Sequence, residues 1–155
     1  MRTFLSINLT PAIHQQIKEL QESLDPALRG IKWTKPQNCH FTLKFLGEYP
    51  EENLPALEEL LNPVAQKFAP FSMELGVLGT FPPRGPLSVL WIGLNKGESV
   101  LQLLEMEINQ ALKKGNISFD KKKFIPHLTI GRAPKHRSVF FNPQKIQYSI
   151  QFDPI

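Results

Sequence analysis

The chain has 155 residues, of which 41% are hydrophobic and 21% charged, which is the size and composition of one globular domain spanning residues 1–155. It contains no apolar run near the roughly 20 residues of a membrane helix. Its single cysteine, Cys39, excludes an internal disulfide and a cysteine-based metal site. We therefore expect a cytoplasmic protein that does not enter a membrane.

The net charge of +4 is unevenly distributed along the chain. The window from Lys113 to Arg137 holds eight basic residues and one acidic residue, a charge of +7, and the rest of the chain carries −3. A local basic patch suits a polyanionic ligand such as RNA. The run DKKK within it, taken alone, favours a solvated lysine-rich loop.

The first half of the chain predicts strands and helices in mixed order. Residues 3–10 alternate as a strand, and Thr10 followed by Pro11 predicts the start of a helix. The apolar residues of that helix fall on one face, at Ile13, Ile17, Leu20 and Leu24. Further strands are predicted over residues 31–35 and 39–47, and a second helix over about 54–68, irregular at Pro63.

The second half predicts two strands, over residues 71–81 and 87–94, joined by the turn-forming segment PPRGP. A helix is expected over residues 99–114, with its inward face formed by Val100, Leu103, Leu104, Ile108 and Leu112. Strands over residues 127–133 and 146–152 complete the order. Because helices do not regularly separate the strands, we expect an α+β fold with a largely antiparallel sheet.

A short motif occurs twice, in NCHFTLKFLG and again in IPHLTIGRAP: a histidine, an apolar residue, a threonine and another apolar residue. In a strand, residues two apart share a face, so His40 and Thr42 point one way, as do His127 and Thr129. Either copy alone is better explained by a histidine with satisfied hydrogen bonds on a half-exposed strand. Two copies with matching apolar partners favour two strands, related by a pseudo-twofold axis, that face one site.

Two histidines and two hydroxyls suit the hydrolysis of a phosphodiester. One imidazole takes a proton from water and the other gives a proton to the departing oxygen, on opposite sides of phosphorus because displacement is in line. The threonine hydroxyls are donors for the non-bridging phosphate oxygens.

Competing chemistries lack their motifs. There is no HExxH, His14 and His136 have no partner motif, and no GxGxxG, phosphate-binding lysine loop or GxSxG elbow is present. Cys39 precedes His40 on a strand, so it faces the opposite side and is interpreted as a core cysteine. We expect neither a metal nor a cofactor.

The segments HFTLKFLGE and PHLTIGR resemble the paired H-x-T-x motifs of the two-histidine phosphoesterases. They are most similar to those of the bacterial and archaeal RNA 2′,3′-cyclic phosphodiesterases, once called 2′-5′ RNA ligases. The segments RTFLSINL and VLWIGL also resemble parts of that family. The resemblance implies a bilobal α+β fold in which two pseudo-symmetric lobes, with flanking helices, each supply one motif to a central cleft.

The resemblance also implies metal-independent opening of a 2′,3′-cyclic phosphate to a 2′-phosphate. His40 is then the proton donor to the leaving 3′ oxygen, and His127 accepts a proton from water. The family places an arginine five residues after the second histidine, which here is Arg132. Strict alternation turns Arg132 away from His127, and a bulge or bend at Gly131 would turn it toward the phosphate. The alternative is an ordinary basic residue at a strand end.

Two residues of the first motif are further candidates for substrate binding. Phe45 occupies the place equivalent to Arg132, where it either stacks on a base or packs in the core. Lys44 shares the face of His40 under strict alternation and would add positive charge at the cleft.

The leading interpretation is an enzyme that acts on RNA with a 2′,3′-cyclic phosphate end, such as a tRNA fragment. One alternative keeps the chemistry on a small nucleotide cyclic phosphate such as ADP-ribose 1″,2″-cyclic phosphate. The other is a nucleotide- or RNA-binding module that turns nothing over. We expect the protein to be a monomer.

Overall fold

The computed structural model describes residues 1–141, so the strand predicted over residues 146–152 lies outside the described residues. Its strands and α-helices follow in the order β1 (Arg2–Ile7), α1 (Pro11–Leu24), β2 (Lys32–Trp33), β3 (Phe41–Glu48), α2 (Leu54–Gln66), β4 (Glu74–Phe81), β5 (Val89–Lys96), α3 (Glu98–Lys114) and β6 (Leu128–Arg132). The order matches the sequence prediction, and helix α2 continues through Pro63. Within residues 1–141, no helix has the length and apolar character needed to cross a membrane.

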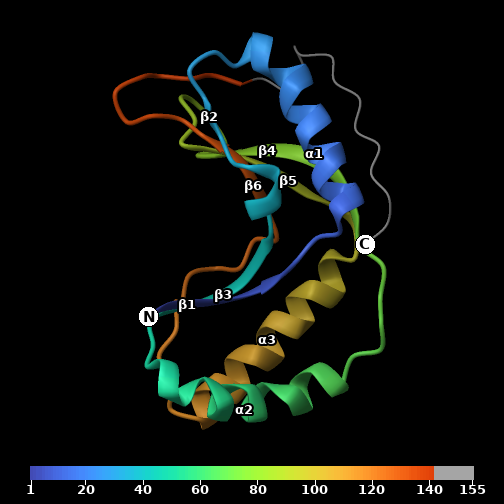
Figure 1. The fold of residues 1–155 in the computed structure, drawn as a ribbon, viewed down its shortest axis with the longest axis vertical. Helices are drawn as coiled ribbons and strands as arrows, with labels where there is room; N and C mark the ends of the chain where they lie inside the picture. Colours follow the sequence, from blue (N-terminus) through green and yellow to red (C-terminus); the bar gives the residue numbers. More distant parts are fainter. Residues whose placement is uncertain (142–155) are drawn as a thin grey trace.

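The strands form one antiparallel sheet in the order β1-β3-β6-β5-β4, with β2 paired to β6. Strands β1 and β3 pair along their lengths, as do β4 and β5, whereas β3 and β6 meet at the single register pair Phe41 and Leu128. The sheet therefore has two halves joined at a narrow seam. Figure 1 shows α2 and α3 beside β1 and β3, and α1 beside the other half. This arrangement confirms the expected bilobal α+β fold.

Helix α1 forms where its local signals predict it. Thr10 is the N-cap, and its hydroxyl accepts a hydrogen bond from the Ile13 N–H at 3.3 Å. Ile13, Ile17 and Leu24 are fully buried against the sheet core. Burying each such side chain contributes about 1.5–3 kcal/mol, so the apolar face holds the helix in place.

Helix α3 differs from its prediction in the face that it buries. The buried positions are Leu101, Glu105, Ile108 and Leu112, and Leu103 is 51% exposed. The expectation that Leu103 faces inward is wrong. A charged residue, Glu105, occupies the inward stripe because it pairs with Lys44 of β3 inside the protein.

Candidate active site

The two motifs adopt the same pattern of burial. Residues 39, 41, 43 and 44 are buried, residues 40 and 42 are partly exposed, and residue 45 is exposed. Residues 126–132 repeat this pattern position by position. Each histidine lies immediately before its strand, β3 or β6, and each threonine is the second residue within it. The two motifs are therefore structural copies of each other, one from each lobe.

The seam between the lobes brings the copies together. Phe41 pairs with Leu128 in antiparallel register, so continuing the register by one residue on each side places His40 opposite Thr129 and Thr42 opposite His127. Side chains directly opposite each other on one face lie about 5 Å apart at Cβ. A cavity of about 420 Å³ is lined by all four, together with Arg2, Phe4, Thr34, Asn38, Phe45 and Arg132. The structure thus collects both motifs in one cleft.

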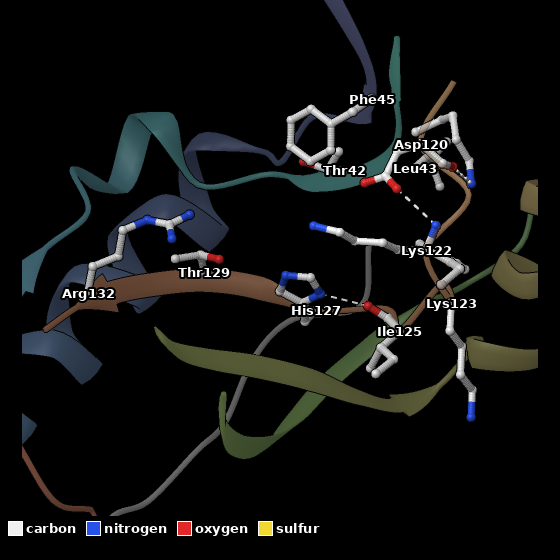
Figure 2. Close-up of a pocket in the computed structure, with 12 residues that line it drawn as sticks. Thr42, Leu43, Phe45, Asp120, Lys122, Lys123, Ile125, His127, Thr129 and Arg132 are labelled. Carbon is white, nitrogen blue, oxygen red and sulfur yellow. Dashed lines mark hydrogen bonds between the residues drawn. The ribbon is translucent and has the colours of Figure 1, made fainter. Parts of the chain in front are cut away.

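A backbone carbonyl orients each imidazole in the same way. His40 Nδ1 lies 2.7 Å from the Asn38 oxygen, and His127 Nδ1 lies 2.6 Å from the Ile125 oxygen, as Figure 2 shows for the second. A carbonyl only accepts, so Nδ1 carries the hydrogen in each ring. Nε2 is consequently the nitrogen that can take up or release a proton in both residues.

A β-bulge in β6 turns Arg132 toward the cleft. Gly131 pairs with Leu90 and Thr129 with Trp91, which leaves Ile130 between them without its own partner in β5. The extra residue shifts the alternation by one, so Arg132 lines the cavity on the side of Thr129. The bend expected at Gly131 is therefore present, with Ile130 as the inserted residue.

The bulge is fixed from behind by polar contacts. The Ile130 carbonyl accepts hydrogen bonds from the Thr34 N–H at 2.9 Å and from Gln21 Nε2 at 3.0 Å. Gln21 is buried on α1, and its amide also donates to the Thr34 carbonyl at 2.8 Å. At Gly131, an added Cβ would lie 3.0 Å from Ile31 Cγ2, so glycine permits the close packing beside the bulge.

Strand β3 contains the equivalent bulge, which corrects one prediction. Lys44 pairs with Leu5 and Thr42 with Ser6, so Leu43 is the inserted residue. Lys44 then points inward, where its ammonium forms an ion pair with Glu105. The expectation that Lys44 shares the face of His40 is wrong, because strict alternation fails at Leu43. Lys44 borders an adjoining cavity of about 250 Å³, where its charge is paired with that of Glu105.

The same bulge brings Phe45 to the cleft. Its side chain is 44% exposed and lines the cavity with Thr42, so it does not pack in the core. The Phe45 ring lies 5.9 Å from that of Phe4, which stacks on the His40 imidazole at 5.0 Å between ring centroids. Phe4 was not predicted from the sequence, and its only signal was its place on the strand that pairs with β3.

Aromatic rings also flank the second histidine. The Phe81 ring packs edge-on against His127 at 4.9 Å, and the Trp91 ring lies 6.2 Å away. Neither was predicted, because the sequence gives no sign that β4 and β5 reach this motif. Both rings pack against the His127 imidazole and restrict its orientation.

A second cavity of about 250 Å³ continues the cleft past the same threonines, His127 and Arg132. Its far wall includes Lys122 and Lys123, in a loop where the Lys122 N–H donates to Asp120 Oδ1 at 2.9 Å. Figure 2 shows the Lys122 side chain extending over the cleft toward His127, whereas Lys123 points away. Part of the basic segment predicted from the sequence therefore borders the site.

Cys39 has the character of a core residue, as predicted. It is buried, and its Sγ lies 3.5 Å from the Thr129 oxygen. Burial raises the pKa of the thiol to about 11, so the group stays protonated near neutral pH and is no nucleophile. No group of three or more His, Cys, Asp or Glu side chains that could hold a metal ion occurs among residues 1–141.

Two lobes present equivalent histidine and threonine pairs across an antiparallel seam, the arrangement expected of a two-histidine phosphoesterase. The chain belongs to the LigT like Phosphoesterase family, whose model matches residues 7–91.

Relatives of known name and structure agree with this assignment. The RNA 2′,3′-cyclic phosphodiesterase of Archaeoglobus fulgidus is 37% identical over 135 residues, covering 87% of this chain and 74% of that protein. The RNA 2′,3′-cyclic phosphodiesterase of Thermotoga maritima is 32% identical over 155 residues, covering 100% of this chain and 80% of that protein. The crystal structure of TT0787 of Thermus thermophilus matches with a TM-score of 0.73 and 32% identity, covering 90% of this chain and 81% of that one.

Proposed function

We propose that the protein hydrolyses the 2′,3′-cyclic phosphate end of RNA to a 2′-phosphomonoester without a metal ion. The observation that carries the proposal is that His40, Thr42, His127 and Thr129 line one cavity on either side of the antiparallel pair Phe41 and Leu128. Family membership and relatives named RNA 2′,3′-cyclic phosphodiesterases support the substrate class.

The phosphate binds between the two motifs. The hydroxyls of Thr42 and Thr129 come from opposite strands, so they donate to different non-bridging oxygens and hold phosphorus at the seam. The guanidinium of Arg132, turned into the cavity by the bulge, pairs with the phosphate charge that grows in the transition state.

The two histidines move the protons through Nε2. His127 takes a proton from a water molecule as the water oxygen forms a bond to phosphorus. The bond from phosphorus to the 3′ oxygen breaks, and His40 gives its Nε2 proton to that oxygen, which leaves a 3′-hydroxyl and a 2′-phosphate. The histidines finish in exchanged protonation states and return to the starting states by proton exchange with water.

The rest of the cleft suits a nucleotide chain. Phe45, beside Phe4, offers an exposed aromatic surface on which the terminal base stacks. Lys122 and Lys123 border the adjoining cavity, where each contacts a further phosphate of the RNA backbone. The protein acts as a monomer in this scheme, since both motifs come from one chain.

The test is to incubate purified protein, in excess EDTA, with a short RNA that ends in a 2′,3′-cyclic phosphate. Chromatography against synthetic standards identifies the product, and a variant with both His40 and His127 replaced by alanine controls for contaminating ribonuclease. A 2′-phosphate is expected. A 3′-phosphate would mean that the other oxygen leaves, and no turnover would favour a binding module. Turnover only of a free nucleotide cyclic phosphate would favour the small-molecule alternative.

A further inference from the structure

A buried ion pair lies behind the first motif and takes no part in the proposed chemistry. The side chains of Lys44 and Glu105 are 5% and 8% exposed, and their charged groups are in direct contact. Taking two charges out of water is costly, and an apolar pair of similar volume often stabilises a fold as well or better. The pair therefore calls for a role other than stability.

The Lys44 ammonium also holds the start of the basic loop. It donates a hydrogen bond to the Asp120 carbonyl at 3.3 Å, while the Asp120 N–H donates to the Phe45 carbonyl at 3.0 Å. Asp120 is thus tied to β3 through both of its backbone groups. Glu105 is itself fixed by Asn109, whose Nδ2 donates to the same carboxylate oxygen at 2.9 Å.

A short path leads from this anchor to the second histidine. The loop turns at Asp120, where Oδ1 accepts from the Lys122 N–H, and it reaches Ile125 five residues after Asp120. The Ile125 carbonyl is the group that accepts from His127 Nδ1 at 2.6 Å. Figure 2 shows Asp120, Lys122, Ile125 and His127 following one another around the wall of the cavity.

We propose that Lys44 and Glu105 are positioning residues that fix the loop at Asp120 and thereby orient His127 and place Lys122 over the cleft. His40 provides an internal contrast, because its carbonyl partner belongs to Asn38 in the 3₁₀ turn Pro36–Asn38, and not to the loop that follows Asp120. The effect on turnover rests on the proposed function, whereas the effect on the His127 ring does not.

The test compares Lys44→Met with wild type by two readouts. Long-range ¹H–¹⁵N spectra of the imidazoles report which ring nitrogen carries hydrogen, and kcat is measured on a mononucleoside 2′,3′-cyclic phosphate. Lys44→Met should abolish the ordered Nδ1–H signature of His127, leave that of His40 in place, and lower kcat by about 10- to 100-fold, the scale of a misplaced catalytic group. The control is Lys67→Met, which removes the exposed ion pair with Glu107 between α2 and α3. It should change neither readout.

The double variant Lys44→Met with Glu105→Leu distinguishes an effect on the orientation of His127 from a loss of protein stability. It removes both buried charges, so its melting temperature should recover toward wild type, yet it offers no donor to the Asp120 carbonyl. We expect kcat and the His127 signature to stay at the level of Lys44→Met, and this variant carries the test if the single one does not fold. Recovery of both readouts together with stability would overturn the proposal, as would an unchanged His127 signature in Lys44→Met. If wild-type protein turns over no substrate, the proposed function fails and the spectra alone decide this inference.

Discussion

Neutralising Lys122 and Lys123 tests whether the cleft holds an RNA chain or only its reacting end. Both residues line the second cavity, and Lys121, their neighbour, does not. Each phosphate contact to a single strand contributes about 0.7 to the slope of log affinity against log salt. The variant Lys122→Gln with Lys123→Gln should therefore flatten the slope by about 1.4. Between about 50 and about 200 mM salt, the factor by which its affinity falls should be about 7-fold smaller than that of the wild type. Lys121→Gln should keep the wild-type slope.

The assay is fluorescence anisotropy with a labelled RNA that ends in a 2′-phosphate, the proposed product, because this ligand is not turned over. A second measurement, kcat/KM on a mononucleoside 2′,3′-cyclic phosphate, separates the two lysines. Lys122 extends over the cleft toward His127, so Lys122→Gln should lower this value, and Lys123→Gln should not. Identical salt slopes for the double variant, Lys121→Gln and wild type would refute the reasoning and reduce the segment to a solvated loop.

Four further outcomes follow from the site. His40→Ala or His127→Ala should lower kcat by about 10²-fold or more with an unchanged circular dichroism spectrum; near-normal turnover would contradict the acid and base roles. The pH profile of kcat/KM should be bell-shaped, because the proposed cycle needs one imidazole protonated and the other neutral; a profile with a single limb would contradict it. Activity should survive exhaustive chelation, and loss that one divalent ion restores would indicate metal-assisted hydrolysis. Thr129→Val should lower kcat by about 10²-fold on RNA and mononucleotide alike, as measured by initial rates.

The features that the sequence predicts best are those with local causes. Helix α1 has its cap, its first-turn proline and its apolar stripe within one stretch of chain, and all three are found in place. The same holds for the paired motifs, because alternation over three residues suffices to put His127 and Thr129 on one face. The buried face of helix α3 is not predicted correctly, because the burial of Glu105 depends on Lys44, which lies 61 residues away in the sequence.

Residues supplied to the cleft by neighbouring strands could not be predicted for a related reason. Phe4 reaches His40 from β1, and Phe81 reaches His127 from the end of β4. Both contacts depend on which strands pair and in what register, and neither residue carries a motif of its own. The inserted residues Leu43 and Ile130 belong to the same class, since a bulge is defined by the partner strand as much as by its own sequence.

The buried polar side chains support both bulges. Among residues 1–141, the buried polar or charged side chains are Gln21, Lys44 and Glu105. Gln21 comes from α1 and binds the carbonyl of the residue inserted in β6, while Glu105 comes from α3 and binds the lysine next to the residue inserted in β3. In each lobe, a helix thus fixes the bulge of the neighbouring strand. That bulge turns the fifth residue after the histidine, Phe45 or Arg132, into the cleft. Because the two devices differ chemically, a neutral amide in one lobe and an ion pair in the other, the pseudo-twofold symmetry applies to the backbone and not to the side chains that hold it.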